Sequence, residues 1–170
     1  MQDLLQPFLD RWRLVALLIS GAMLATAHAF QTFGGLAPCE LCLKQRTVYW
    51  VAMGIAAAAM AIVRLPGGSR WREASCWLLA LVFLASVGVA GYHAGVEWKF
   101  WPGPASCSGG GKVSMADLKA LLNGGGVKMP NCDEPAWKMF GLSMAGWNAL
   151  ASVLFTGLSV AAAIRERRRS

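Results

Sequence analysis

Four long stretches without Asp, Glu, Lys or Arg constrain this chain more than any other feature of its sequence. The stretches are residues 14–39, 47–63, 74–96 and 139–164. A helix needs about 20 predominantly apolar residues to cross the hydrocarbon core of a bilayer. Three stretches are long enough, and the second, with 17 residues, can be extended by the residues before it. The pattern predicts an all-α membrane protein, a bundle of four transmembrane helices at about 13–31, 43–63, 73–95 and 141–163.

The composition agrees with a bilayer environment. The 170 residues are 56% hydrophobic and only 15% charged, against about 25% charged residues in soluble domains. The length suits one domain, so we expect residues 1–170 to form a single integral membrane domain with an outer loop at about 96–140. An alternative reading makes the first helix a signal peptide cleaved at Ala27-His28-Ala29, although its apolar run continues to Phe33.

The arginines predict the orientation of the helices. Nine of the ten lie at the N-terminus, in the 64–72 segment or at the C-terminus, which four crossings place on one face. The positive-inside rule makes that face cytoplasmic, so we expect both termini in the cytoplasm. All six lysines fall on the other face, but charges in its long loop count for little. The Arg-rich C-terminal tail is then an anchor facing anionic lipid rather than a nucleic-acid patch.

Four of the five cysteines are predicted to share the outer face. Cys39 and Cys42 lie in the first outer loop, Cys107 and Cys132 lie in the second, and two helices separate the loops. Disulfides persist in such an extracytoplasmic compartment. The fifth, Cys76, falls near the cytoplasmic start of the third helix, where we interpret it as a small apolar filler.

The first pair forms a C-x-x-C directly before the second helix. Its ring is too small to stabilise the fold much by loop closure, so its value is more chemical than structural. A helix N-terminus favours a thiolate, and we expect Cys42 to feel it more than Cys39. Arg46, the one arginine on the outer face, lies one turn after Cys42. Its guanidinium could stabilise that thiolate or an anionic acceptor, or could simply reach the membrane interface.

The second pair, Cys107 and Cys132, is 25 residues apart in a glycine-rich segment. Between the glycines, residues 114–122 carry apolar side chains on one side, which predicts a short amphipathic helix on the membrane surface or one packed within the loop. Three readings of the four outer cysteines remain open: structural disulfides, a zinc site whose second pair lacks close ligand spacing, and a redox relay. Only the relay uses the C-x-x-C, Arg46 and the second pair together. Covalent haem attachment is excluded, since no His follows Cys42.

Two segments resemble the family of disulfide bond formation protein B (DsbB). Residues 38–46, Pro-Cys-Glu-Leu-Cys-Leu-Lys-Gln-Arg, match its Pro-Cys-x-x-Cys-x-x-x-Arg signature. Residues 131–137 and 140–147 are similar to the segment after that family's last cysteine. The likeness extends over nearly the whole chain in helix order and loop length, although the loop after Cys107 is richer in glycine than expected, which bears on partner docking.

The resemblance implies a bacterial inner-membrane protein-disulfide:quinone oxidoreductase, with its redox cysteines in the periplasm. Disulfides Cys39–Cys42 and Cys107–Cys132 are implied. A periplasmic DsbA-type thiol oxidase reduces the second pair through a mixed disulfide at Cys107, and thiol–disulfide exchange passes the electrons to the first pair. Cys42 then reduces a membrane quinone, ubiquinone or menaquinone, which Arg46 helps to bind. His93, at the outer end of the third helix, is a candidate quinone contact or a structural histidine.

Two other functions are kept as alternatives. A vitamin K epoxide reductase-like enzyme also combines four helices, a C-x-x-C and quinone chemistry, but its motif sits on the last helix rather than before the second. A membrane scaffold would carry the same cysteines as purely structural disulfides.

Overall fold

The structure, a computed structural model, describes residues 2–104, 107, 122 and 131–169. Four helices dominate it: α2 (Trp12–Thr32), α3 (Glu40–Val63), α4 (Trp71–Glu97) and α6 (Met144–Arg167). Each is long and apolar enough to cross a membrane. The predicted all-α membrane class with four spanning helices is therefore confirmed.

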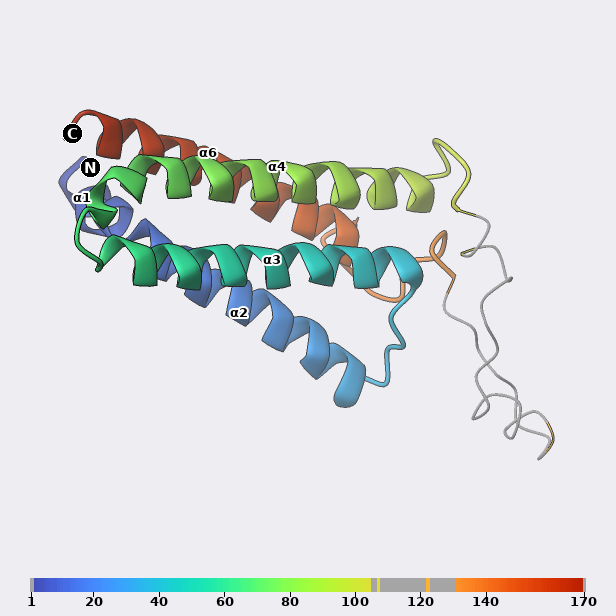
Figure 1. Cartoon of the computed structure of the whole chain (residues 1–170). Helices are drawn as coiled ribbons and strands as arrows, with labels where there is room; N and C mark the ends of the chain where they lie inside the picture. Colours follow the sequence, from blue (N-terminus) through green and yellow to red (C-terminus); the bar gives the residue numbers. More distant parts are fainter. Residues whose placement is uncertain (1, 105–106, 108–121, 123–130, 170) are drawn as a thin grey trace.

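The helices form a bundle in which α4 packs along α6, α3 packs against α4, and α2 packs against α3 (Figure 1). Small residues at the contacts, such as Ala52 and Ala56 on α3 and Ala90 on α4, are fully buried. Small side chains let helix backbones approach closely, which is how helices associate in lipid. Larger residues fill the centre, where Phe83 lies edge-on to Phe155 with ring centroids 5.5 Å apart.

Both chain termini and the α3–α4 connection lie at one end of the bundle, which we call the terminal end (Figure 1). This end adds two elements that the sequence analysis did not predict, α1 (Gln2–Asp10) and the 3-10 turn η1 (Gly68–Arg70). Helix α1 is amphipathic: Phe8 and Leu9 pack against the core, while Asp10 pairs with Arg165 and Arg169 on α6. Its short length and its charged end hid it among the polar residues before the first span.

The opposite end, where α3 begins and α4 ends, is called the cysteine end. Helix α3 starts at Glu40 rather than near 43, because the Cys39 sulfur caps it by accepting the Cys42 amide hydrogen. Helix α6 starts at Met144 rather than 141. The preceding residues form a hairpin of β1 (Lys138–Met139) and β2 (Leu142–Ser143).

The hairpin turns through Phe140 and Gly141, which both have positive φ, 51° and 81°. Positive φ at both central residues is the geometry of a tight two-residue turn. Ser143 then caps α6 by accepting the Gly146 amide hydrogen at 3.1 Å. The amphipathic helix predicted over 114–122 lies, apart from Leu122, outside the part of the chain that the structure describes.

Candidate functional site

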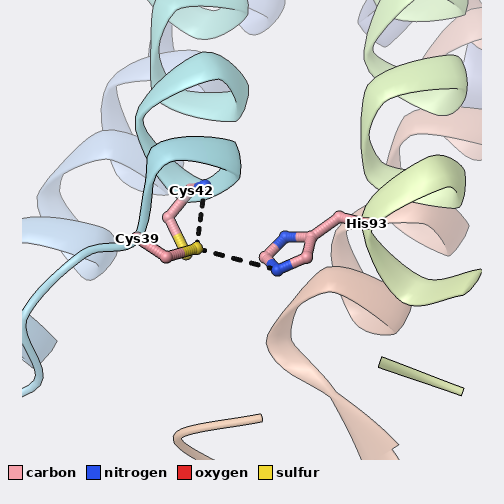
Figure 2. Close-up of side chains that lie close together, drawn as sticks. All are labelled: Cys39, Cys42 and His93. Carbon is pink, nitrogen blue, oxygen red and sulfur yellow. Dashed lines mark hydrogen bonds between the residues drawn. The ribbon is translucent and has the colours of Figure 1, made fainter. Parts of the chain in front are cut away.

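Cys39 and Cys42 lie at the cysteine end, at the first turn of α3 (Figure 2). Both are free thiols in this structure, with their Sγ atoms 2.7 Å apart, and the disulfide expected between them stays a prediction. Cys39 is buried, whereas Cys42 is partly exposed. The helix therefore begins at Glu40 with Cys39 as its cap, so that Cys42 lies in its first turn rather than before it, as the sequence indicated.

Two nitrogen atoms lie within hydrogen-bond distance of the Cys39 sulfur. The Cys42 backbone N–H donates to Cys39 Sγ at 3.3 Å, and His93 Nε2 lies 3.7 Å from the same atom (Figure 2). The hydrogen bond that Cys39 shares with the Cys42 thiol, together with burial, raises the pKa of Cys39 above its ordinary value. In the reduced pair, Cys39 therefore holds its proton more tightly than an ordinary cysteine does.

His93 comes from the last turns of α4 and is only 4% exposed. Its Nδ1 lies 2.6 Å from the Gln45 side-chain nitrogen, and its Nε2 lies 3.7 Å from Glu97 Oε1. Glu97 in turn accepts a hydrogen bond from the Ser143 hydroxyl. The sequence singled out His93 as an interfacial residue; the structure buries it between the thiol pair and two polar side chains.

A disulfide joins Cys107 and Cys132, with their Cα atoms 5.2 Å apart. Both residues are buried, and together with Val96 they pack into one apolar cluster with Cys39 and Leu41. Four cysteines from two loops, 93 positions apart at their extremes, thus meet at one end of the bundle.

The segment after α4 folds back on that helix to carry Cys107. Trp101 stacks on Tyr92 with ring centroids 5.9 Å apart and donates its indole N–H to the Tyr92 carbonyl at 3.0 Å. Gly95 makes room for this ring, since a Cβ there would lie 2.1 Å from a Trp101 ring carbon. A recess of about 450 Å³ opens beside Cys107, lined among others by Lys99, Asn131 and Asp133.

Arg46 bridges α3 to the outer end of α2. Its guanidinium donates to the Gln31 side chain at 2.6 Å and to the Ala27 carbonyl at 3.0 Å. Helix α2 diverges from the rest of the bundle toward this end (Figure 1), and Phe33 just beyond it is 87% exposed. The region thus has hydrogen-bond donors one helical turn from Cys42, beside exposed apolar surface.

Cys76 lies at the other end, 1% exposed, in the core with Trp12 and Leu79. The Arg13 guanidinium donates to its sulfur at 3.6 Å and forms an ion pair with Glu166 at 3.0 Å. Cys76 is buried as a filler would be, but it also accepts a hydrogen bond that the sequence gave no reason to expect.

A metal is a chemical alternative for the reduced site. The ligand atoms of Cys39, Cys42 and His93 lie within 4.8 Å of one another, and zinc accepts both thiolates and imidazole. Two Zn–S bonds of about 2.3 Å at a tetrahedral angle hold their sulfurs roughly 3.8 Å apart. The 2.7 Å separation found here is shorter than that and nearer to the length of a disulfide bond, about 2.05 Å.

Sequence reasoning missed the polar residues beneath the thiols, which are Gln45, Tyr49, Glu97, Ser143 and Asn148. Gln45, Tyr49 and Asn148 are at most 8% exposed. A signal was present, because a polar side chain in an otherwise apolar span is a functional candidate by default. What the pattern could not supply was which of them meet.

The comparisons with known proteins agree with this geometry. The family model described as disulfide bond formation protein DsbB matches residues 10–162. The chain is 33% identical to a disulfide bond formation protein B of Methylococcus capsulatus over 85% of its length and 86% of the relative's. A protein of the same name from Chromohalobacter salexigens is 31% identical, over 92% of both chains. No solved structure matches.

Proposed function

The chain belongs to the DsbB family of disulfide bond formation proteins, and from this premise we propose that it oxidises a periplasmic DsbA-type dithiol protein and passes the electrons to a membrane quinone. Family membership makes it an oxidoreductase of disulfide formation, and four spanning helices suit a multi-pass protein of the bacterial inner membrane. The single observation that carries the proposal is that a disulfide and a thiol pair pack into one cluster.

The first step takes place at Cys107–Cys132. A thiolate of the reduced partner attacks the Cys107 sulfur, breaks the disulfide and expels the Cys132 thiolate with the bonding electron pair. The partner's second thiolate then attacks its own bonded sulfur, which releases the oxidised partner and the Cys107 thiolate. The recess beside Cys107 gives a partner a route to this sulfur.

The second step transfers the electron pair between the two cysteine couples. With Cys39 and Cys42 oxidised, the Cys132 thiolate attacks the Cys39 sulfur and expels the Cys42 thiolate. Attack by Cys107 on Cys132 then re-forms the outer disulfide and releases the Cys39 thiolate. Every group involved lies in the same apolar cluster, so no long-range movement separates donor from acceptor.

Cys42 is the sulfur proposed to face the quinone. A bound quinone would be the two-electron acceptor of high potential. The partly exposed Cys42 is the accessible member of its pair, whereas Cys39 is buried and its pKa is raised. Arg46 is placed to hold the acceptor's oxygen by a hydrogen bond, in exchange for its present contacts with Gln31 and Ala27.

Anaerobic turnover of the purified protein tests the proposal. Reduced DsbA-type protein is supplied together with ubiquinone or menaquinone, and quinone reduction and partner thiols are followed at once. We expect one quinone reduced per disulfide formed. Partner oxidation with no quinone consumed would overturn it, and so would labelling by an impermeant maleimide that places positions 39 and 107 on opposite sides of the membrane.

Arg46→Ala tests the quinone contact. Loss of one charged hydrogen-bond donor should raise the half-saturating quinone concentration about tenfold, while both cysteine pairs still oxidise. Lys44→Ala is the matched control, because Lys44 lies on the same turn but is half exposed and pairs with Glu40. An unchanged quinone dependence in Arg46→Ala would contradict the assignment.

A further inference from the structure

Beneath the thiol pair, a hydrogen-bonded chain of buried polar side chains links three helices. Asn148 on α6 donates its amide hydrogen to Gln45 Oε1 on α3 at 2.5 Å, and the Tyr49 hydroxyl on α3 donates to Asn148 Oδ1. Gln45 Nε2 lies 2.6 Å from His93 Nδ1 on α4. All four residues are at most 8% exposed. In a membrane protein such groups are costly to bury, so their alignment calls for a role.

The direction of each hydrogen bond follows from the chemistry of the groups. The Gln45 oxygen is occupied by the Asn148 amide, so the Gln45 nitrogen faces the histidine. An amide nitrogen only donates. His93 Nδ1 must therefore accept, which means that it carries no hydrogen. A protonated imidazolium is disfavoured for the same reason, since its Nδ1–H would meet a second donor.

The ring's one hydrogen is thereby placed on Nε2. That atom faces Cys39 Sγ and Glu97 Oε1, each 3.7 Å away, and the ring also forms a hydrogen bond with the backbone of Cys132. On the opposite side, the groups facing the ring through Gln45 are neutral, namely Asn148 and Tyr49.

We propose that Gln45, Asn148 and Tyr49 are positioning residues that fix His93 as its neutral Nε2–H tautomer, so that it donates a hydrogen bond to the Cys39 sulfur during exchange. The inference rests on the proposed function and assigns His93 to the cysteine couple rather than to the acceptor.

The donor acts at one defined moment of the exchange. When the Cys107 thiolate attacks Cys132 in the Cys39–Cys132 mixed disulfide, the S–S bond breaks and its electron pair leaves on Cys39. The Nε2–H and the Cys42 backbone N–H both point at that sulfur. They stabilise the leaving thiolate as charge develops on it, and no proton has to be transferred.

The experiment reads the tautomer directly. Protein labelled with ¹⁵N-histidine is placed in nanodiscs, and ring nitrogen shifts are recorded at neutral pH, with the His28→Gln variant used to assign His93. We expect His93 to be neutral with its hydrogen on Nε2. A hydrogen on Nδ1 would mean that His93 donates to Gln45 instead of accepting from it, and the inference would be wrong.

Gln45→Glu replaces the hydrogen-bond donor that faces His93 Nδ1 with an acceptor. It keeps the side chain's shape and the oxygen that accepts from Asn148. A carboxylate accepts rather than donates, so the ring hydrogen should move to Nδ1 and leave Nε2 with no hydrogen for the Cys39 sulfur. A doubly protonated ring would keep its Nε2–H, and slow transfer in that state would contradict the inference. Transfer from Cys107/Cys132 to Cys39–Cys42, measured by single-turnover thiol trapping without quinone, should slow about tenfold, as expected for the loss of a hydrogen bond to a charged group. A shifted tautomer with an unchanged transfer rate would remove the functional part of the inference.

Two further variants complete the design. Asn148→Leu leaves the Gln45 oxygen without its donor, so that the amide can turn and the ring should populate both tautomers. Thr156→Val is the matched control, because the Thr156 hydroxyl donates a partly buried hydrogen bond to the Ser152 carbonyl of its own helix, outside the chain of side chains that leads to His93. The histidine spectrum of this variant should equal that of the wild type.

The tautomer is observed without partner or quinone, so the two proposals fail separately. A Nδ1–H ring in a protein that reduces quinone would overturn only the positioning role. A Nε2–H ring that responds to Gln45→Glu in a protein without quinone turnover would overturn the proposed acceptor instead.

Discussion

The two ends of the bundle each bury a cysteine beside a nitrogen donor, and they differ in what else is within reach. At the terminal end, Cys76 is 3.6 Å from an Arg13 nitrogen, and that arginine is held by Glu166. At the cysteine end, Cys39 is 3.7 Å from His93 Nε2 and 2.7 Å from a second sulfur. A thiol becomes a redox group when another sulfur can bond to it; Cys76 has no such neighbour among the residues described, so burial leaves it a small apolar side chain.

The forces that hold the ends differ in the same way. A buried ion pair between Arg13 on α2 and Glu166 on α6 joins the terminal end, with Arg13 also donating to the Arg72 carbonyl at the start of α4. At the cysteine end, the buried bonds that join α3 to α4 and α6 are neutral, and the ion pair Lys99–Asp133 is exposed. The buried ion pair suits a terminal end that stays fixed. Thiol–disulfide exchange, in contrast, needs a cysteine end in which bonds can break and form again.

Replacing each of the two buried cysteines should show the largest difference in activity between the two ends. Cys39→Ala removes a sulfur that the electron path needs, so turnover should fall to background. Cys76→Ala should cost only about 1 kcal/mol of unfolding free energy and keep turnover near that of the wild type. Quinone reduction per folded molecule is the measurement. An inactive but well-folded Cys76→Ala would mean that the terminal end takes part in the chemistry.

The ion pair offers the next largest effect. Glu166→Gln leaves Arg13 buried without its counter-charge and should lower the unfolding free energy by about 3–5 kcal/mol. The double variant Arg13→Met with Glu166→Leu removes both charges, and most of that loss should return because no ion is then desolvated. Unfolding in mixed SDS and mild-detergent micelles measures both. A double variant as unstable as the single one would show that the pair is held by more than charge compensation.

Two glycines of α4 test whether the cysteine end depends on the packing of the Trp101 segment against that helix. Gly95→Ala places a Cβ where the Trp101 ring lies, so we expect a loss of about 1–3 kcal/mol from overpacking and slower reduction of the Cys107–Cys132 disulfide. Gly91→Ala is the control, one turn away on the same helix with no atom within 4 Å of the new Cβ. It should be neutral or slightly stabilising. Equal behaviour of the two variants would separate the Trp101 segment from the site.

The smallest effect concerns exposed carboxylates at the two ends. Hydrogen bonds from Arg165 and Arg169 lower the pKa of Asp10, and a hydrogen bond from Lys99 lowers the pKa of Asp133. A carboxyl whose pKa is lower when folded stabilises the fold above its unfolded pKa, and this contribution is lost as pH falls from about 4 through the folded value. Unfolding measured from pH 7 to pH 3 should show less acid dependence in Asp10→Asn and Asp133→Asn, more so for Asp10 with its two partners. Unaltered acid curves in both variants would contradict these pairings.

The sequence predicted the molecule's framework correctly. Four charge-free stretches located the spans within a few residues, and the even number of crossings brought the C-x-x-C and the Cys107–Cys132 region to one end. Besides the missed α1 and η1, the errors at the ends of the spans are the early start of α3 at Glu40 and the hairpin before α6. There the outcome depends on a single cap or turn, and a hydrophobicity pattern contains no term for either.

The buried contacts were decided by tertiary structure alone. Gln45 and Asn148 are 103 positions apart and belong to different helices, and neither sequence neighbourhood distinguishes them from other polar residues in a span. Hydrophobicity is a sum over local residues, so it determines which segments enter the membrane. The rotation of each helix about its axis and its shift along its neighbours depend on how all the side chains interlock, and only that packing turned His93 toward the Cys39 sulfur.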